Sequence, residues 1–185
     1  MIEETYFEAE ESMEKAINAL ASDYSRIRTG RASARMLDHI QVEYYGVPTP
    51  ITQLAGVKVP EAHLLVVEPW DKSILRAMEK AIMASDLGIT PSNDGFVIRL
   101  PFPAPTEERR RELVKQCKNM AETTRTAVRN ARRDANAKLE KAKKASEISE
   151  DDMHRAQDEI QKLTDKFIAK VDETFKAKEA EVMEV

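Results

Sequence analysis

Three stretches of the chain repeat apolar residues every three or four positions, a spacing that places them on one face of a helix. The stripes predict one helix up to about residue 29, a second over about 107–145 and a third over about 150–183. Three helices with one apolar face each can bury those faces against one another, so the pattern predicts a three-helix bundle. The predicted stripe of the second helix consists of Leu113, Cys117, Met120, Thr124, Ala127, Ala131, Ala135, Leu139 and Ala142.

The ends of these helices carry recognisable signals. Thr106 and Ser149 each precede two or three acidic residues, as expected for N-cap residues whose hydroxyl accepts a backbone N–H of the first turn. Gly30 is predicted to end the first helix as a left-handed cap. At about 1.5 Å per residue the second helix would be roughly 58 Å long, so an elongated shape is expected.

Glycine and proline divide the chain, because all five glycines and all eight prolines lie between residues 30 and 105. Both residue types break helices, so their absence elsewhere permits long helices and their clustering marks a turn-rich segment. We therefore predict an α+β protein. Residues 1–30 and 106–185 form a discontinuous bundle domain, residues 31–105 an inserted β/α/β domain, and the hinges lie near 29–32 and 101–106.

The predicted insert contains short strands and one helix. In "HIQVEYYG", Ile40, Val42 and Tyr44 alternate with polar residues as in a half-buried strand, and "GVPTP" after it is predicted to be a turn. The runs "AGVKVP", "HLLVVEPW" and "GFVIRLP" are further strand candidates, whereas "KSILRAMEKAIMASDLG" has helical spacing and ends near Gly88. The order of the strands in the sheet cannot be read from the sequence.

Charge is segregated along the chain, whose formal net charge is −4. Residues 106–144 hold thirteen basic and six acidic residues, while the first and third helices are acidic. At about 100° per residue, four arginines of the second helix point away from its apolar stripe. A solvated charged face and ion pairs with the acidic helices are two interpretations. The third is a phosphate-binding surface, favoured by the planar fork of arginine. The four arginines are Arg125, Arg129, Arg132 and Arg133.

A second basic stretch, "IRTGRAS", places Arg28 and Arg31 around Gly30 at the predicted hinge. A plain helix end with two exposed arginines explains it equally well on spacing alone. Arg28 and Arg110 lie near the hinge end of the predicted bundle and could extend the basic surface, although Arg110 is oblique to the main arginine group. Phosphate contacts without interleaved aromatic residues favour structured RNA over stacked single strands.

The sequence offers no constellation for catalysis. The three histidines, His39, His63 and His154, lack metal-ligand spacing, and Cys117 falls on an apolar stripe where a core role is expected. No apolar run approaches the roughly 18 residues of a membrane span. The acidic start lacks the features of a signal or transit peptide, and one cysteine excludes an internal disulfide, so a cytoplasmic location is expected.

The stretches "IRTGRAS", "EYYGVPTPITQLA", "KAIMASDLGITP", "LPFPAPTEERR" and "VRNARRDAN" together resemble bacterial ribosome recycling factors. The resemblance covers essentially the whole chain and follows the family's order and spacing. It implies an L-shaped molecule, a three-helix bundle with a smaller β/α/β domain joined by two hinge segments. It also implies that the bundle binds rRNA of the large ribosomal subunit across the P-site region.

The resemblance further implies a function after termination. With elongation factor G, which hydrolyses the GTP, the factor splits the post-termination ribosome into subunits and catalyses no reaction itself. No cofactor, metal, membrane or small-molecule substrate is expected, and the chain is expected to act as a monomer. Arg132 is the first rRNA-binding candidate by match to the family motif, and Gly30, Pro103 and Pro105 are hinge candidates. The other rRNA-binding candidates are Arg129, Arg133, Arg28, Arg31, Arg110 and Arg125.

Two alternatives remain at this point. The heptad-like spacing also allows a coiled-coil adaptor or holdase without ribosome-splitting activity, whose binding would be insensitive to salt. A general RNA-binding or ribosome-stasis factor would bind ribosomes but would not split them with elongation factor G.

Overall fold

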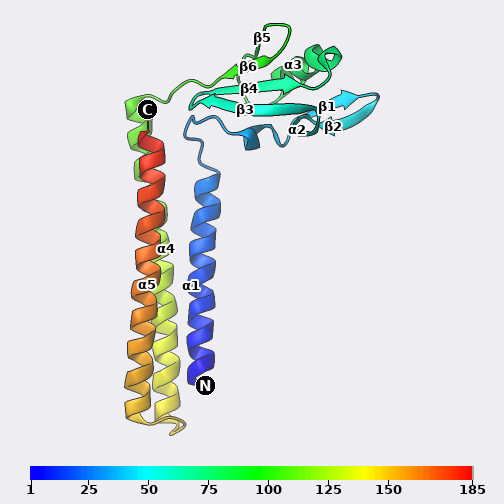
Figure 1. Ribbon diagram of the computed structural model, residues 1–185. Helices are drawn as coiled ribbons and strands as arrows, with labels where there is room; N and C mark the ends of the chain where they lie inside the picture. Colours follow the sequence, from blue (N-terminus) through cyan, green and yellow to red (C-terminus); the bar gives the residue numbers. More distant parts are fainter. Residues whose placement is uncertain (185) are drawn as a thin grey trace. The chain divides into compact units, whose positions relative to one another are not determined.

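The computed structural model describes residues 1–184, which divide into two compact units. Residues 1–29 and 107–184 form the bundle unit, and residues 30–106 form the small unit. The bundle unit consists of α1 (Ile2–Ser25), α4 (Glu107–Lys144) and α5 (Glu150–Met183), which run alongside one another in Figure 1. The three predicted helices and the α+β fold class are thereby confirmed. None of the helices described in residues 1–184 is long and apolar enough to cross a membrane.

The connection between α4 and α5 is short, so the two helices are antiparallel neighbours. Ser149 is the N-cap of α5, as predicted, because its hydroxyl oxygen accepts the backbone N–H of Asp152 at 3.1 Å. The residue that reverses the chain is Ser146, with φ +59°. The following N–H, of Glu147, returns to the carbonyl of Ala142 at 2.9 Å and ties the turn to α4.

The first helix ends earlier than predicted. α1 ends at Ser25, and the N–H groups of Arg26 and Ile27 donate to Asp23 and Tyr24, both at 3.2 Å. These short-range hydrogen bonds close the last turn without a left-handed residue. Gly30 does have a left-handed φ of +78°, but it lies several residues beyond the helix, so the prediction that it caps α1 is wrong.

The bundle core follows the predicted stripes with two shifts on α4. After Cys117 the buried stripe steps to Ala121, which is fully buried, and the predicted Met120 is half-buried. After Thr124 the buried stripe steps four residues to Val128 instead of three to Ala127, so Val128 is fully buried and Ala127 is exposed. An α-helix has 3.6 residues per turn, and a stripe of alternating three- and four-residue steps must therefore change step along a long helix. On α5, Lys178 continues the stripe as a buried residue whose Nζ lies 3.4 Å from Glu181 Oε2.

The small unit is built on a four-stranded antiparallel sheet with the order β3-β4-β6-β5. Its strands are β3 (Ala55–Glu61), β4 (Leu64–Pro69), β6 (Ile98–Pro101) and β5 (Ser92–Asn93). The sequence did not reveal this order. The helix α3 (Leu75–Ala84) follows β4, and shorter helical segments are α2 (Ile51–Leu54) and the 3₁₀ turns Ala34–Leu37 and Lys72–Ile74.

A separate hairpin pairs β1 (Gln41–Tyr44) with β2 (Val47–Pro50). The segment "GVPTP" was predicted to be a turn, and this prediction is wrong for its last four residues. β2 has only β1 as a partner, and an edge strand tolerates proline because it does not need every N–H for pairing. The turn itself consists of Tyr45 and Gly46, with φ of +49° and +77°, the left-handed pair that a tight hairpin requires.

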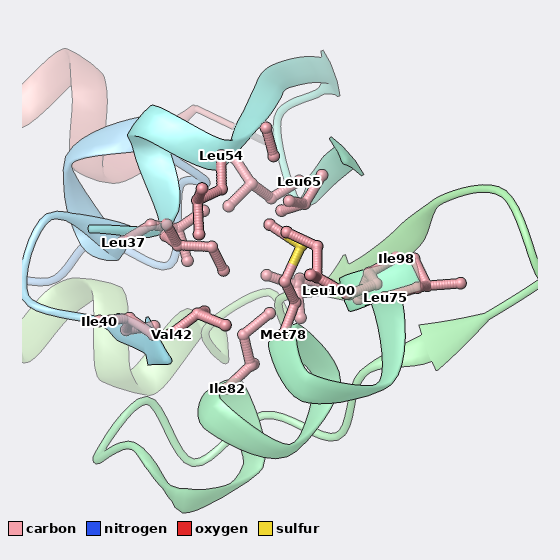
Figure 2. Packing of buried hydrophobic residues seen from close by; sticks show 14 of the residues in the cluster. Leu37, Ile40, Val42, Leu54, Leu65, Leu75, Met78, Ile82, Ile98 and Leu100 are labelled. Carbon is pink, nitrogen blue, oxygen red and sulfur yellow. The ribbon is translucent and has the colours of Figure 1, made fainter. Parts of the chain in front are cut away.

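Each unit has its own apolar core. In the small unit, side chains of the sheet, the hairpin and α3 converge between these elements, as Figure 2 shows for Val42, Leu65, Met78, Ile98 and Leu100. These five side chains are 0–1% exposed. In the bundle unit, Phe167, Leu139 and Met13 are among the fully buried side chains. Because burial of apolar area drives folding, two separate cores make each unit a self-supporting body.

Candidate nucleic-acid interface

Three arginines of α4 form a solvent-accessible group, which we call the arginine face: Arg129, Arg132 and Arg133. Arg133 is exposed and has no ion pair within residues 1–184. The side chain of Arg129 is 45% exposed, and its Nη1 lies 3.5 Å from Glu122 Oε1. A surface ion pair of this kind contributes little to stability. Both guanidinium groups can therefore turn to an arriving phosphate at small cost.

Arg132 is half-buried and its direction is set by the neighbouring helix. Its Nη1 donates to Gln161 Oε1 of α5 at 3.1 Å. Gln161 is oriented in turn, because its Nε2 donates to Asp165 Oδ1 at 2.9 Å. A neutral amide leaves the positive charge of Arg132 uncompensated and the other guanidinium N–H groups available for a phosphate oxygen. Sequence reasoning missed Gln161, since nothing in the spacing of α5 marks it.

Arg125 is held differently, although the sequence grouped it with the arginine face. Its side chain is 17% exposed, and Nε and Nη2 donate to Asp172 Oδ1 of α5 at 3.0 and 2.5 Å. Nη1 donates to Glu122 Oε2 at 2.8 Å. The hydrogen bonds to Asp172 raise the pKa of Arg125, and those from Arg125 lower the pKa of Glu122. Ion pairing with an acidic helix, one of the interpretations left open, applies to this arginine.

Arg110 does not belong to an exposed basic surface. The residue is 8% exposed, and its Nη1 lies 3.4 Å from the carbonyl oxygen of Met183 at the end of α5. A cation there suits the negative end of a helix dipole. Its Nε is buried without a hydrogen-bond partner in residues 1–184. This environment indicates a packing role between α4 and α5, and not the extension of the basic surface that the sequence predicted.

The two arginines around Gly30 belong to different units. Arg28 is exposed in the bundle unit, after the end of α1. Arg31 is exposed in the small unit and is not without an interaction partner. Each stays a prediction as an rRNA contact.

The turn between β3 and β4 holds both chain segments that lead out of the small unit; we call its residues Ala62 and His63 the linker turn. The carbonyl of Ala62 accepts the N–H of Ala32 at 2.7 Å, and that of His63 accepts the N–H of Phe102 at 2.7 Å. His63 Nδ1 lies 2.8 Å from the carbonyl oxygen of Gly30, which can only accept, so Nδ1 carries the proton. One turn therefore fixes both segments.

Gly30 also packs against the second segment. A Cβ on Gly30 would lie 2.7 Å from Pro105 Cδ and 3.4 Å from the carbonyl oxygen of Pro103. With φ +78°, a side chain at this position would be strained on conformational grounds as well. Gly30 thus lies close to both other hinge candidates inside the small unit. Sequence reasoning considered His63, which bonds to Gly30, only as a possible metal ligand.

The described residues hold no group of three or more histidine, cysteine or carboxylate side chains with metal-binding geometry. Cys117 is fully buried, as predicted, and burial raises the pKa of its thiol. The Tyr24 hydroxyl donates to the Cys117 carbonyl at 2.7 Å, so this region of the bundle is a packed core.

The fold is that of an α+β protein with a small sheet unit inserted into a three-helix bundle, and an exposed group of arginines is typical of nucleic-acid-binding proteins. The family model described as ribosome recycling factor matches residues 20–183. The chain belongs to the ribosome recycling factor family.

Similar proteins agree over the full length. The chain is 56% identical over 185 residues to the ribosome-recycling factor of Geobacillus kaustophilus (strain HTA426), with all of both chains covered. It is 52% identical over 184 residues to that of Nitratidesulfovibrio vulgaris (strain DP4), which covers 100% of this chain and 99% of the relative.

Two solved structures are also similar. A solution structure of a ribosome recycling factor has a TM-score of 0.73 at 41% identity and covers 100% of this chain and 98% of that one. The other describes models of the T. thermophilus factor and E. coli elongation factor G bound to the E. coli post-termination complex. It has a TM-score of 0.62 at 45% identity and covers 99% of both chains.

Proposed function

We propose that this protein binds the post-termination ribosome and, together with elongation factor G, splits it into subunits. Elongation factor G hydrolyses the GTP, and the protein itself catalyses no reaction. Family membership supports the proposal, as does the similar structure described with elongation factor G on a post-termination complex. The observation on this chain that carries it is the arginine face, positive charge on an otherwise acidic protein.

The arginine face binds the phosphates of large-subunit rRNA in this proposal. Arg132 is the central contact, because Gln161 orients its fork without neutralising it. Arg129 and Arg133 flank it. Contacts to phosphates position a protein on RNA and carry no sequence information, which suits a factor that must act on every terminated ribosome.

The linker turn gives the small unit its mechanical role. Gly30 packs against Pro105, and the linker turn bonds to Gly30, Ala32 and Phe102, so both segments move together with the small unit. A displacement of the small unit by elongation factor G is then passed to α1 and α4 at the same time. Rotation of one rigid body against another about short connecting segments is a common form of domain movement.

The first experiment follows subunit splitting by light scattering, with purified post-termination complexes, elongation factor G and GTP. Arg132→Ala should reduce ribosome affinity and splitting together. The matched control is Arg109→Ala, an exposed arginine on another side of the same helix that pairs with Glu112. Wild-type binding without any splitting would contradict the proposal and indicate a stasis factor, whereas binding insensitive to salt would favour an adaptor.

The second experiment separates binding from splitting. Gly30→Ala places a methyl group against Pro105, whereas Gly88→Ala suffers the same left-handed strain, φ +68°, with nothing within 4 Å. Gly30→Ala should keep ribosome binding and slow splitting more than Gly88→Ala does. Equal behaviour of the two variants, or equal loss of binding and splitting in Gly30→Ala, would contradict the proposed role of the linker turn.

A further inference from the structure

An open groove of about 470 Å³ is lined mostly by residues of α1 and α5. The start of α1, the end of α4 and the start of α5, which supply its residues, lie at the same end of the bundle (Figure 1). Its floor consists of Leu139, Ala156 and Ile160, which belong to the bundle core. Tyr6 and Phe7 of α1 form part of its wall. Phe7 is 65% exposed, although a phenyl ring gains free energy from burial. The surface of the groove is therefore mostly apolar and open to solvent.

The two helices that flank the groove are acidic. α1 carries seven acidic residues and one basic residue, and residues 150–165 of α5 carry six acidic and two basic ones. Glu3 and Glu159 stand at the groove itself. Among residues 1–184, the one basic side chain that lines the groove is Arg155, which is already paired with Asp152 at 3.0 Å. The side chains that line the groove thus carry a net negative charge, from Glu3, Asp152 and Glu159 against Arg155, opposite in sign to the arginine face.

We propose that this groove docks a lysine- or arginine-rich segment of a partner protein, which inserts large apolar side chains between α1 and α5. The apolar floor supplies the anchor site, and the acidic rim selects a cationic segment. RNA is a poor occupant, because its phosphates would meet the carboxylates of both helices. A second copy of the same face is disfavoured for the same reason, since acidic rim would oppose acidic rim.

The proposal is independent of ribosome splitting and can be tested with the isolated protein. Two synthetic twelve-residue peptides carry the same six lysines; one also has two leucines four positions apart, and in the other these are serines. Binding is followed by NMR of the ¹³C-labelled methyl groups of Ile2, Leu139, Ala156 and Ile160. The leucine peptide should bind about tenfold more tightly than the serine peptide, the effect of burying apolar side chains, and should shift these methyl signals.

Variants of the protein locate the binding. Phe7→Ala should weaken the leucine peptide about fivefold without unfolding the bundle, because most of the ring is exposed. Met183→Ala removes an exposed apolar side chain, 45% exposed, at the other end of α5 and should leave binding unchanged. Glu3→Gln/Glu159→Gln should weaken the leucine peptide and make its binding less sensitive to salt.

Several results would overturn the proposal. Equal affinity for the leucine and serine peptides would contradict the apolar anchor. Equal affinity for a leucine peptide with glutamates in place of lysines would contradict the preference for a cationic segment. The same methyl shifts with a single-stranded RNA oligomer would make the groove a nucleic-acid site. Dimers in analytical ultracentrifugation that dissociate in Phe7→Ala would assign the groove to a second copy of this chain.

Discussion

Two stretches of α4 use arginine in opposite ways. Around residues 129–133 the guanidinium groups are exposed or are oriented by a neutral amide, as Arg132 is by Gln161. At Arg110 and Arg125 they are largely buried and bond to α5, through the Met183 carbonyl and through Asp172. The same residue type on one helix is therefore available to a ligand at residues 129–133 and serves helix packing at Arg110 and Arg125. The partner on α5 makes the difference.

The largest expected effect is on ribosome affinity. In the triple variant Arg129→Ala/Arg132→Ala/Arg133→Ala, the arginine face is removed while the paired arginines remain. Removing each arginine–phosphate interaction should cost about tenfold, and neighbouring interactions are not strictly additive, so affinity should fall by at least about 100-fold. The slope of log affinity against log salt should fall by about one for each phosphate that is no longer neutralised.

Co-sedimentation with large ribosomal subunits over a salt series measures both quantities. Circular dichroism checks that the triple variant stays folded, since Arg132 is half-buried and bonds to Gln161 of α5. An unchanged affinity with an unchanged salt slope would mean that the arginine face is only a solvated surface.

The next effect is on stability and concerns Arg125. Arg125→Ala removes the guanidinium partner of Asp172 and the nearer of the two partners of Glu122, and should lower the free energy of unfolding of the bundle by about 1 kcal/mol. Ribosome affinity should change less than about threefold. Urea denaturation measures the first quantity and co-sedimentation the second. A large affinity loss without destabilisation would return Arg125 to the arginine face.

Much of the fold could be predicted because helix signals are local. The absence of glycine and proline, the apolar spacing and Ser149 located all three bundle helices. The predicted stripe on α4 was wrong at Ala127. A three-residue and a four-residue step are equally plausible there in the sequence, and the packing of the neighbouring helices determines which residue is buried. The strand β2 was missed because its two prolines suggest a turn, and an edge position is a property of the assembled sheet.

The candidate site could be predicted only in part. Helical angle correctly placed Arg129 and Arg133 on the outside. It did not separate Arg125 from them, because its partner Asp172 lies 47 residues away on another helix. The linker turn could not be predicted from the sequence for the same reason, since His63 contacts Gly30 only after the sheet has formed. Pairings between elements distant in sequence depend on packing that a single sequence does not display.

A smaller effect on ribosome affinity separates the contribution of the planar guanidinium group from that of its positive charge. Arg132→Lys keeps the positive charge but loses the planar pair of donors and the bond to Gln161. Ribosome affinity should fall about threefold, with the salt slope unchanged, and Gln161→Ala should reproduce part of this loss. Wild-type ribosome affinity of Arg132→Lys in co-sedimentation would show that rRNA recognises only the positive charge of residue 132.

The smallest expected effect is a pH dependence of the stability that Arg125 and its carboxylate partners contribute. The hydrogen bond from Arg125 lowers the pKa of Glu122 below its ordinary 4.5. A carboxyl group with a lowered pKa in the folded state stabilises the fold above its ordinary value, and this contribution is lost as the pH falls through the lowered pKa. The stability difference between wild type and Arg125→Ala should therefore be full at neutral pH and shrink below about pH 4.5. Urea denaturation at neutral pH and near pH 3 measures it, and NMR titration of the Glu122 carboxyl checks the assignment. A difference that stays constant into acid would mean that Arg125 stabilises the bundle through the packing of its aliphatic stem, and not through its carboxylate partners.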